Sequence, residues 1–112
     1  MHYQNEHQLH IHLHALKLTV QIMNKMYGVV IEVNLKNRLF SVKLEDGNYS
    51  VCFMRAPINL EVGSVLFGSF KCYGMNYLET ERNGEEILVD TLHILISEET
   101  AKYFVSEPGS VG

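Results

Sequence analysis

The 112-residue chain contains no tryptophan and only two cysteines and two prolines. Cys52 and Cys72 are too few for a disulfide framework and lack the Cys-x-x-Cys spacing of a zinc site, so we interpret both as free thiols. Pro57 and Pro108 fall at the ends of predicted elements. No apolar run reaches the roughly 18 residues of a membrane span, and no secretory signal pattern opens the chain. These absences predict a cytoplasmic protein with no membrane partner.

Motifs for catalysis and for cofactor binding are missing as well. The chain has no Gly-rich phosphate loop, no Gly-x-Ser-x-Gly and no His-Glu-x-x-His. Cys52 lies in a predicted strand beside Ser50 and Met54, where neither a cation nor a helix N-terminus would lower its thiol pKa. We therefore expect a protein that is not an enzyme and that needs no cofactor.

Charge is unevenly distributed along the chain, whose net charge is −4. Residues 1–25 carry two basic and one acidic side chain, and residues 26–78 carry five and four. Residues 79–112 carry two basic and eight acidic side chains, a net of −6. Affinity for nucleic acid comes largely from neutralised phosphates, so this acidic balance disfavours nucleic acid as a partner.

The clearest local pattern is a hairpin over residues 38–54, centred on Asp46-Gly47. Asp-Gly between two alternating runs is typical of a two-residue type I′ turn, which fixes the strand register. That register predicts an apolar face formed by Phe40, Val42, Leu44, Tyr49, Val51 and Phe53. The opposite face then carries Leu39, Ser41, Lys43, Glu45, Asn48, Ser50, Cys52 and Met54.

The remaining chain is also rich in β patterns. Strands are predicted at 26–33, 64–73, 75–81 and 86–96, with a second type I′ turn at Asn83-Gly84. Ser97 is a predicted N-cap, followed by a helix with Ala101, Phe104 and Val105 facing inward. We expect one domain, residues 1–112. It comprises a flexible start (1–8), a β-barrel (9–96), a short helix (97–106) and a loose tail (107–112).

Residues 9–23 alternate in hydrophobicity, but the phase changes once, near Ala15-Leu16. A strand with a β-bulge explains this change, and a helix is the alternative because Leu9, Leu13, Leu16, Val20 and Met23 follow helical spacing. We favour the extra N-terminal strand, since a helix would be apolar all round. One small barrel would cover only part of this apolar surface. We therefore expect a homo-oligomer whose interface contains Leu9, Ile11, Leu13, Leu16, Leu18, Val20 and Ile22.

The predicted fold is all-β, a small meander barrel. The segment GVVIEVNLKNRLFSVKLEDGNYSVCFM, with LEVGSVLFGSF after it, resembles the OB-fold barrels, most nearly the one-domain translation initiation factor and the S1-type domains, over about residues 26–73. The resemblance implies single-stranded nucleic-acid binding on the outer face of strands 2 and 3. Its candidate basic residues are Lys36, Arg38, Lys43, Arg55 and Lys71. The predicted outer face of the hairpin has no aromatic residue, so no stacking residue is carried over from the family.

A row of histidines provides the only candidate metal site. His10, His12 and His14 would share one face of a strand, about 7 Å apart, and two of them suit zinc if another ligand completes the site. The alternative is that the three imidazoles form the polar side of a half-buried strand or belong to an interface. His93 is expected to be a hydrogen-bonded wall residue of the last strand.

These observations favour a non-catalytic, self-associating β-barrel that serves as a binding or assembly module. The two alternatives are a single-stranded nucleic-acid-binding OB protein and a metal-binding protein that uses the histidine row.

Overall fold

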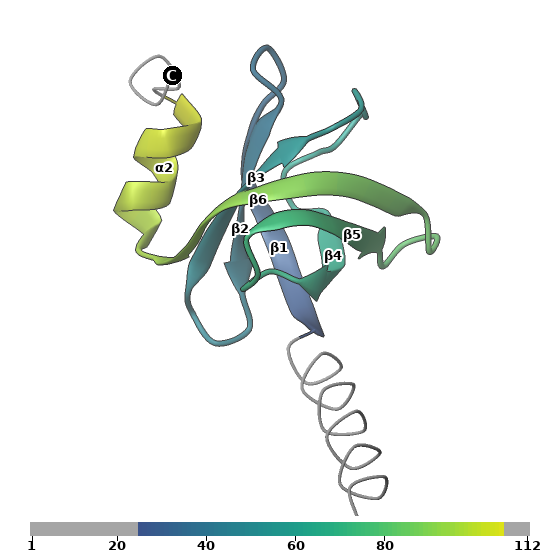
Figure 1. Cartoon of the computed structure of the whole chain (residues 1–112), viewed down its shortest axis with the longest axis horizontal. Helices are drawn as coiled ribbons and strands as arrows, with labels where there is room; N and C mark the ends of the chain where they lie inside the picture. The colour runs from purple at the N-terminus through teal and green to yellow at the C-terminus, as the bar shows by residue number, and fades with distance from the viewer. Residues whose placement is uncertain (1–24, 107–112) are drawn as a thin grey trace, which may run out of the picture.

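The computed structural model describes residues 25–106, which form six strands and one helix (Figure 1). The elements are β1 (Lys25–Asn34), β2 (Leu39–Leu44), β3 (Tyr49–Met54), β4 (Val65–Ser69), β5 (Gly74–Thr80), β6 (Glu86–Ile96) and α2 (Glu98–Ser106). The predicted all-β small barrel with a short C-terminal helix is confirmed. The predicted flexible start (1–8), N-terminal strand (9–23) and loose tail (107–112) lie outside the described residues.

The strands close into an antiparallel barrel in the order β1-β2-β3-β6-β5-β4. Two three-stranded meanders, β1-β2-β3 and β4-β5-β6, meet at two seams, where β3 pairs with β6 and β1 pairs with β4. The meander is thus interrupted once, because residues 55–64 carry the chain from β3 to β4 without pairing these strands. The closed six-stranded barrel is compatible with an OB-like barrel, although the OB-fold itself has five strands.

The β2–β3 turn differs from the predicted one by a single residue. The Leu44 N–H donates to the Asn48 carbonyl oxygen (2.8 Å), and the Gly47 N–H donates to the Leu44 carbonyl oxygen (2.9 Å). The loop therefore has three residues, 45–47, with Gly47 in the left-handed region at φ 89°. This is the arrangement of a type I turn followed by a glycine bulge. Phe40 accordingly pairs with Cys52, so the predicted two-residue turn is wrong.

The one-residue shift exchanges the two faces of β3, because neighbouring strand residues point to opposite sides. Cys52 and Met54 are buried inside the barrel, whereas Tyr49, Val51 and Phe53 lie on its outer side. The prediction that Phe40, Val42 and Leu44 line the core is confirmed. Tyr49 and Val51 are also buried, but in a second cluster beneath α2 with the half-buried Phe53, so the prediction that all six residues share one face is wrong.

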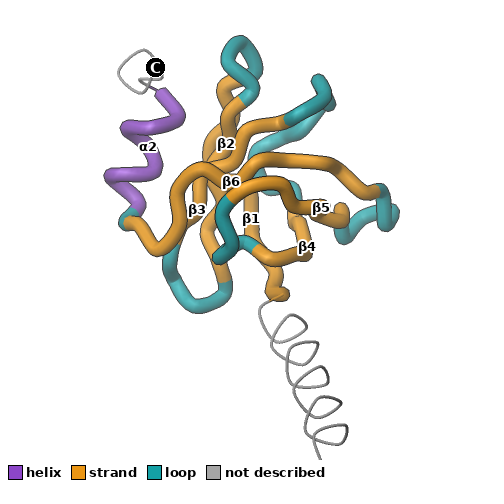
Figure 2. The backbone as a smooth tube through the Cα atoms, in the orientation of Figure 1, coloured by secondary structure: helices purple, strands orange, loops and turns teal. Residues whose placement is uncertain are grey.

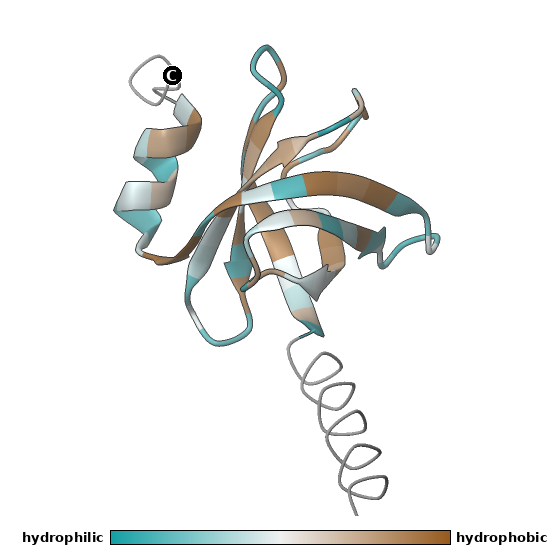
Figure 3. Ribbon diagram, in the orientation of Figure 1, coloured by the Kyte–Doolittle hydropathy of each residue, from teal (hydrophilic) through white to brown (hydrophobic). Residues whose placement is uncertain are grey.

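The barrel interior is a single apolar cluster to which all six strands contribute. Figure 3 shows hydrophobic residues along the strands and hydrophilic residues at most turns. Three polar side chains, those of Ser41, Ser50 and Thr91, are buried, and the Ser50 hydroxyl donates to the Phe70 carbonyl oxygen at 2.8 Å. The buried members of the cluster are Val30, Phe40, Val42, Leu44, Cys52, Met54, Leu60, Leu66, Phe70, Leu78, Ile87 and Val89.

The β5–β6 turn is also longer than predicted. The Thr80 N–H donates to the Glu85 carbonyl oxygen (2.9 Å), and the Gly84 N–H donates to the Thr80 carbonyl oxygen (2.8 Å). Four residues, 81–84, therefore separate the paired ends of the strands. The predicted two-residue turn at Asn83-Gly84 is wrong, although the hairpin itself is present.

The C-terminal helix α2 lies on one side of the barrel, separate from the strands that form its wall (Figure 2). Its N-cap is the predicted one, because the Ser97 hydroxyl oxygen accepts the N–H of Thr100 at 3.2 Å. Ala101 and Val105 are buried and Phe104 is half-buried, which confirms the predicted inward face. No helix among residues 25–106 combines the length and the apolarity that a membrane span requires.

Candidate functional site

The outer face of β2 and β3, where an OB-type protein would bind its ligand, is covered by α2. Leu39, Tyr49 and Val51 project from the strands and are buried against Ala101 and Val105 of the helix. The corrected register thus gives this face aromatic residues, but the helix occupies the space that a nucleotide base would need.

At the end of β6 the same interface contains His93. Its imidazole stacks on the Phe104 ring, with ring centroids 3.7 Å apart and planes 6° apart. Burial lowers the pKa of His93, because the charged imidazolium loses hydration there. His93 is therefore a wall residue of β6 as predicted, and its contact with α2 is ring stacking rather than the predicted hydrogen bond.

The five predicted basic residues do not converge on one surface. Arg38 and Arg55 lie together, because the Arg38 Nη1 donates to the Arg55 carbonyl oxygen at 3.2 Å. Lys36 lies near them in the β1–β2 turn. Lys43 and Lys71 lie toward the opposite end of the β2–β3 hairpin, about 16 Å away at 3.3 Å per strand residue.

Two of these five cations already have acidic partners. The Arg55 Nε donates to the Asp90 carboxylate at 2.9 Å, and Lys71 pairs with Asp46. The hydrogen bond from Lys71 is the main reason why the pKa of Asp46 is lowered. Arg38 also stacks over the Phe53 ring, 5.1 Å from its centroid. Lys36, Arg38 and Lys43 have no acidic partner among residues 25–106, but they are divided between the two ends of the β2–β3 hairpin.

The predicted metal ligands, His10, His12 and His14, lie outside the described residues, as does the predicted interface in 9–23. Within residues 25–106 no group of three or more His, Cys, Asp or Glu side chains is placed to hold a metal ion. The two cysteines are free and separate, with Cys72 exposed and Cys52 fully buried. Burial raises the pKa of the Cys52 thiol to about 12, so it is not a thiolate at neutral pH.

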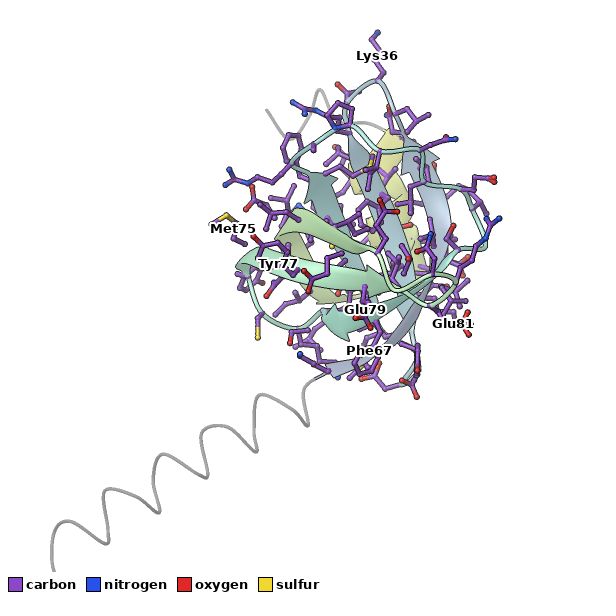
Figure 4. The ribbon with its side chains drawn as sticks, turned by 90° about the vertical axis from the view of Figure 1, so that its right-hand side faces the viewer. Lys36, Phe67, Met75, Tyr77, Glu79 and Glu81 are labelled. Atoms are coloured by element: carbon purple, nitrogen blue, oxygen red, sulfur yellow. The ribbon has the colours of Figure 1, made fainter. Side chains whose placement is uncertain are left out.

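A different surface carries two of the exposed tyrosines, Tyr27 and Tyr77. We define the outer patch as the outward-facing apolar side chains of β1, β4, β5 and β6 on the side of the barrel away from α2 (Figure 1). Tyr77 is 64% exposed, Met75 60% and Tyr27 47%. Figure 4 shows Phe67, Met75 and Tyr77 projecting from this side. The outer patch consists of Tyr27, Val29, Val65, Phe67, Met75, Tyr77 and Leu88.

The strand register arranges the centre of the outer patch in a row across four strands. Tyr27 pairs with Phe67, and their ring centroids are 4.8 Å apart. Phe67 pairs with Glu79, which in turn pairs with Glu86. Directly opposed residues share a face of the sheet, so two aromatic rings and two carboxylates stand side by side.

The two carboxylates of this row have no compensating charge in the part of the chain that the structure describes. Among the side chains of residues 25–106, no Lys or Arg lies within ion-pair distance of Glu79 or Glu86. Like charges directly opposite each other destabilise a sheet. An apolar surface with two neighbouring, unpaired carboxylates is chemically suited to an apolar segment that carries a cation.

Sequence reasoning missed the outer patch. The aromatic residues of β1 and β5 do alternate with interior residues, which is a detectable signal. Tyr27 and Phe67 are 40 positions apart, however, and they meet only because β4 pairs with β1 at the seam.

Comparisons with protein-family models, with curated proteins and with solved structures give no match.

Proposed function

We propose that this chain is a non-catalytic β-barrel module that acts by self-association. The observation that carries the proposal is the outer patch, an exposed group of aromatic and aliphatic side chains on the strands of a closed barrel. Exposed apolar patches of this kind mark interaction surfaces, and most assemblies of a single chain are closed and symmetric. The free thiol of the exposed Cys72 is typical of a reducing compartment such as the cytoplasm.

Two features of this barrel favour a protein partner over nucleic acid, whether or not the barrel is OB-like. The face that OB-type proteins use is covered by α2, and the exposed alternative contains Glu79 and Glu86 beside its aromatic pair. Carboxylates at that position repel a phosphate backbone. The basic residues that would attract one are divided between two ends of the barrel.

The first test is the molecular mass in solution. We expect light scattering on the full chain to give the mass of a dimer or a higher closed oligomer at micromolar concentration and neutral pH. A chain lacking residues 1–24 is expected to be a monomer, because it loses the apolar residues predicted to form the interface. The barrel strands and α2 all lie in residues 25–106, so circular dichroism of the shortened chain should still show the strand signal.

A full-length chain that is still monomeric at about 100 µM would refute self-association. A dissociation constant of about 10⁻⁴ M corresponds to an association free energy of only about −5 kcal/mol. An oligomer that persists after the deletion would keep the proposed function but place the interface within residues 25–106.

The second test addresses nucleic acid directly. We expect labelled single-stranded DNA and RNA oligonucleotides to bind weakly at low salt and to lose most of that binding by about 0.2 M salt, because only a few cations contribute. Fluorescence anisotropy measures this. Sub-micromolar affinity that survives 0.2 M salt would instead favour the nucleic-acid alternative.

A further inference from the structure

We propose that the outer patch binds residues 9–23 of a second copy of this chain, with Lys17 placed against Glu79 and Glu86. This inference rests on the proposed self-association and names the two surfaces that meet. The argument uses the chemistry of the patch, the composition of the segment and the position at which the segment joins the barrel.

The patch requires a partner that is mainly apolar and carries one or two positive charges. Tyr27, Phe67 and Tyr77 offer aromatic surface, whereas Glu79 and Glu86 face each other without a cation among the described residues. A purely apolar partner would bury these carboxylates unpaired, which is costly, and a strongly charged partner would leave the rings exposed.

Residues 9–23 have this composition. Eleven of the fifteen are Leu, Ile, Val, Met, Ala, Thr or Gln, three are His, and Lys17 is the only Lys, Arg, Asp or Glu. The single cation lies near the middle of the segment, flanked by leucine on both sides. It is therefore placed to reach a pair of carboxylates while its neighbours contact aromatic rings.

The connection to the barrel brings the segment to the margin of the patch. Residue 24 precedes Lys25, which pairs with Ser69 where β1 and β4 begin their seam. Tyr27 and Phe67 lie only two residues farther along the same strand pair. In a symmetric dimer built around this margin, each segment starts beside its own patch and reaches the equivalent patch of the other copy.

A second copy suits the segment better than its own barrel does. The apolar residues are odd-numbered from 9 to 15 and even-numbered from 16 to 22, so they form two sets that do not share one face of an unbroken strand. The surface of one barrel can bury only one of these two sets of apolar residues. If two copies exchange residues 9–23, one set is buried against the partner barrel and the other is buried between the two segments.

The test uses charge exchange in the full chain, with sedimentation velocity as the measurement of dimer affinity. We expect Lys17→Glu and Glu79→Lys each to weaken the dimer by about tenfold or more, since each places like charges together in a partly desolvated interface. The double variant should recover most of the wild-type affinity. Tyr77→Ser should also weaken the dimer without unfolding the barrel, because the Tyr77 side chain is 64% exposed and lies outside the barrel core.

Glu99→Lys is the matched control, because Glu99 is exposed on α2, on the other side of the barrel. It should change the dimer affinity by less than about twofold, as expected of a charge outside the interface. If removal of residues 1–24 abolishes the dimer but Glu79→Lys and Tyr77→Ser leave the dimer affinity unchanged, the outer patch is not the docking surface. Self-association would then still hold.

A cross-linking experiment separates a second copy from the same copy. Equal amounts of ¹⁴N and ¹⁵N protein are refolded together and treated with a carbodiimide, which joins a Lys amine to a carboxylate without a spacer. We expect cross-linked peptides between Lys17 and Glu79 or Glu86 to contain mixed isotopes. Peptides with matching isotopes only would mean that the segment binds its own barrel, which overturns the proposal.

Discussion

Replacing Met54 with alanine is expected to lower the free energy of unfolding by about 2–5 kcal/mol, the usual range for truncating a fully buried methionine. Met54 has no exposed surface and packs inside the barrel, where the wall on every side is paired. The cavity left by the truncation cannot be filled by a simple side-chain movement. Urea unfolding followed by circular dichroism measures the loss.

Phe53→Ala is the informative comparison, because Phe53 is the next residue and lies on the other face. Phe53 is half-buried outside the barrel, between the α2 interface and the Arg38 guanidinium. Its truncation should cost about 1–2 kcal/mol, less than that of Met54, since it removes less buried apolar surface and leaves no closed cavity. The opposite ranking would mean that the β2–β3 turn has two residues and that Phe53 points inward.

Gly68→Ala is expected to lower the free energy of unfolding by about 1–3 kcal/mol, the usual cost of overpacking. A Cβ atom built at Gly68 would lie 2.5 Å from Leu78 Cδ2 and 3.2 Å from the Tyr77 carbonyl oxygen. The Leu78 side chain is buried, and the Tyr77 carbonyl oxygen belongs to the backbone of the same strand, β5. Neither atom can therefore move away easily. Thermal unfolding of the two proteins provides the comparison.

A double-mutant cycle with Leu78→Val checks the cause. Valine lacks the Cδ2 atom that meets the new methyl group, so the double variant should lose less stability than the two single losses added together. Gly28→Ala is the milder control, because its Cβ would meet the side chains of Leu44 and Phe70 at the longer distances of 3.1 Å and 3.3 Å. Strict additivity would show that Gly68 is required for a reason other than this contact.

Alternation of hydrophobicity was sufficient to predict the strands, the helix and the barrel class. Each of these elements depends on a short stretch of chain, as the Ser97 cap and the inward Ala101 and Val105 illustrate. Asp46-Gly47 was misread by one residue because a glycine with positive φ suits both a two-residue turn and a three-residue turn with a bulge. Which of the two turns forms depends on which face of β3 packs inside the barrel. Both faces of β3 are apolar, so hydrophobicity alone does not distinguish the two turns.

The candidate site was less predictable, because it depends on strand neighbours rather than on strands. The basic residues were grouped by sequence, but the hairpin places Arg38 and Lys43 at opposite ends of one strand. Neither Tyr27 nor Phe67 indicates a site in the sequence, and the two rings come into contact only because β1 pairs with β4. Helix α2 was predicted correctly, whereas its position over β2 and β3 could not be inferred from its own amphipathic pattern.

The seam between β3 and β6 makes β3 dependent on a part of the chain that is synthesised later. On the ribosome, β3 emerges early but has no second neighbour until residues 86–96 have been made. The outer side of β3 remains bare even longer, until α2 brings Val105 over it. During this interval the nascent chain presents an open strand edge and an apolar surface, which are the features that chaperones bind and that drive aggregation. Translation of residues 86–106 therefore sets the time during which β3 needs protection.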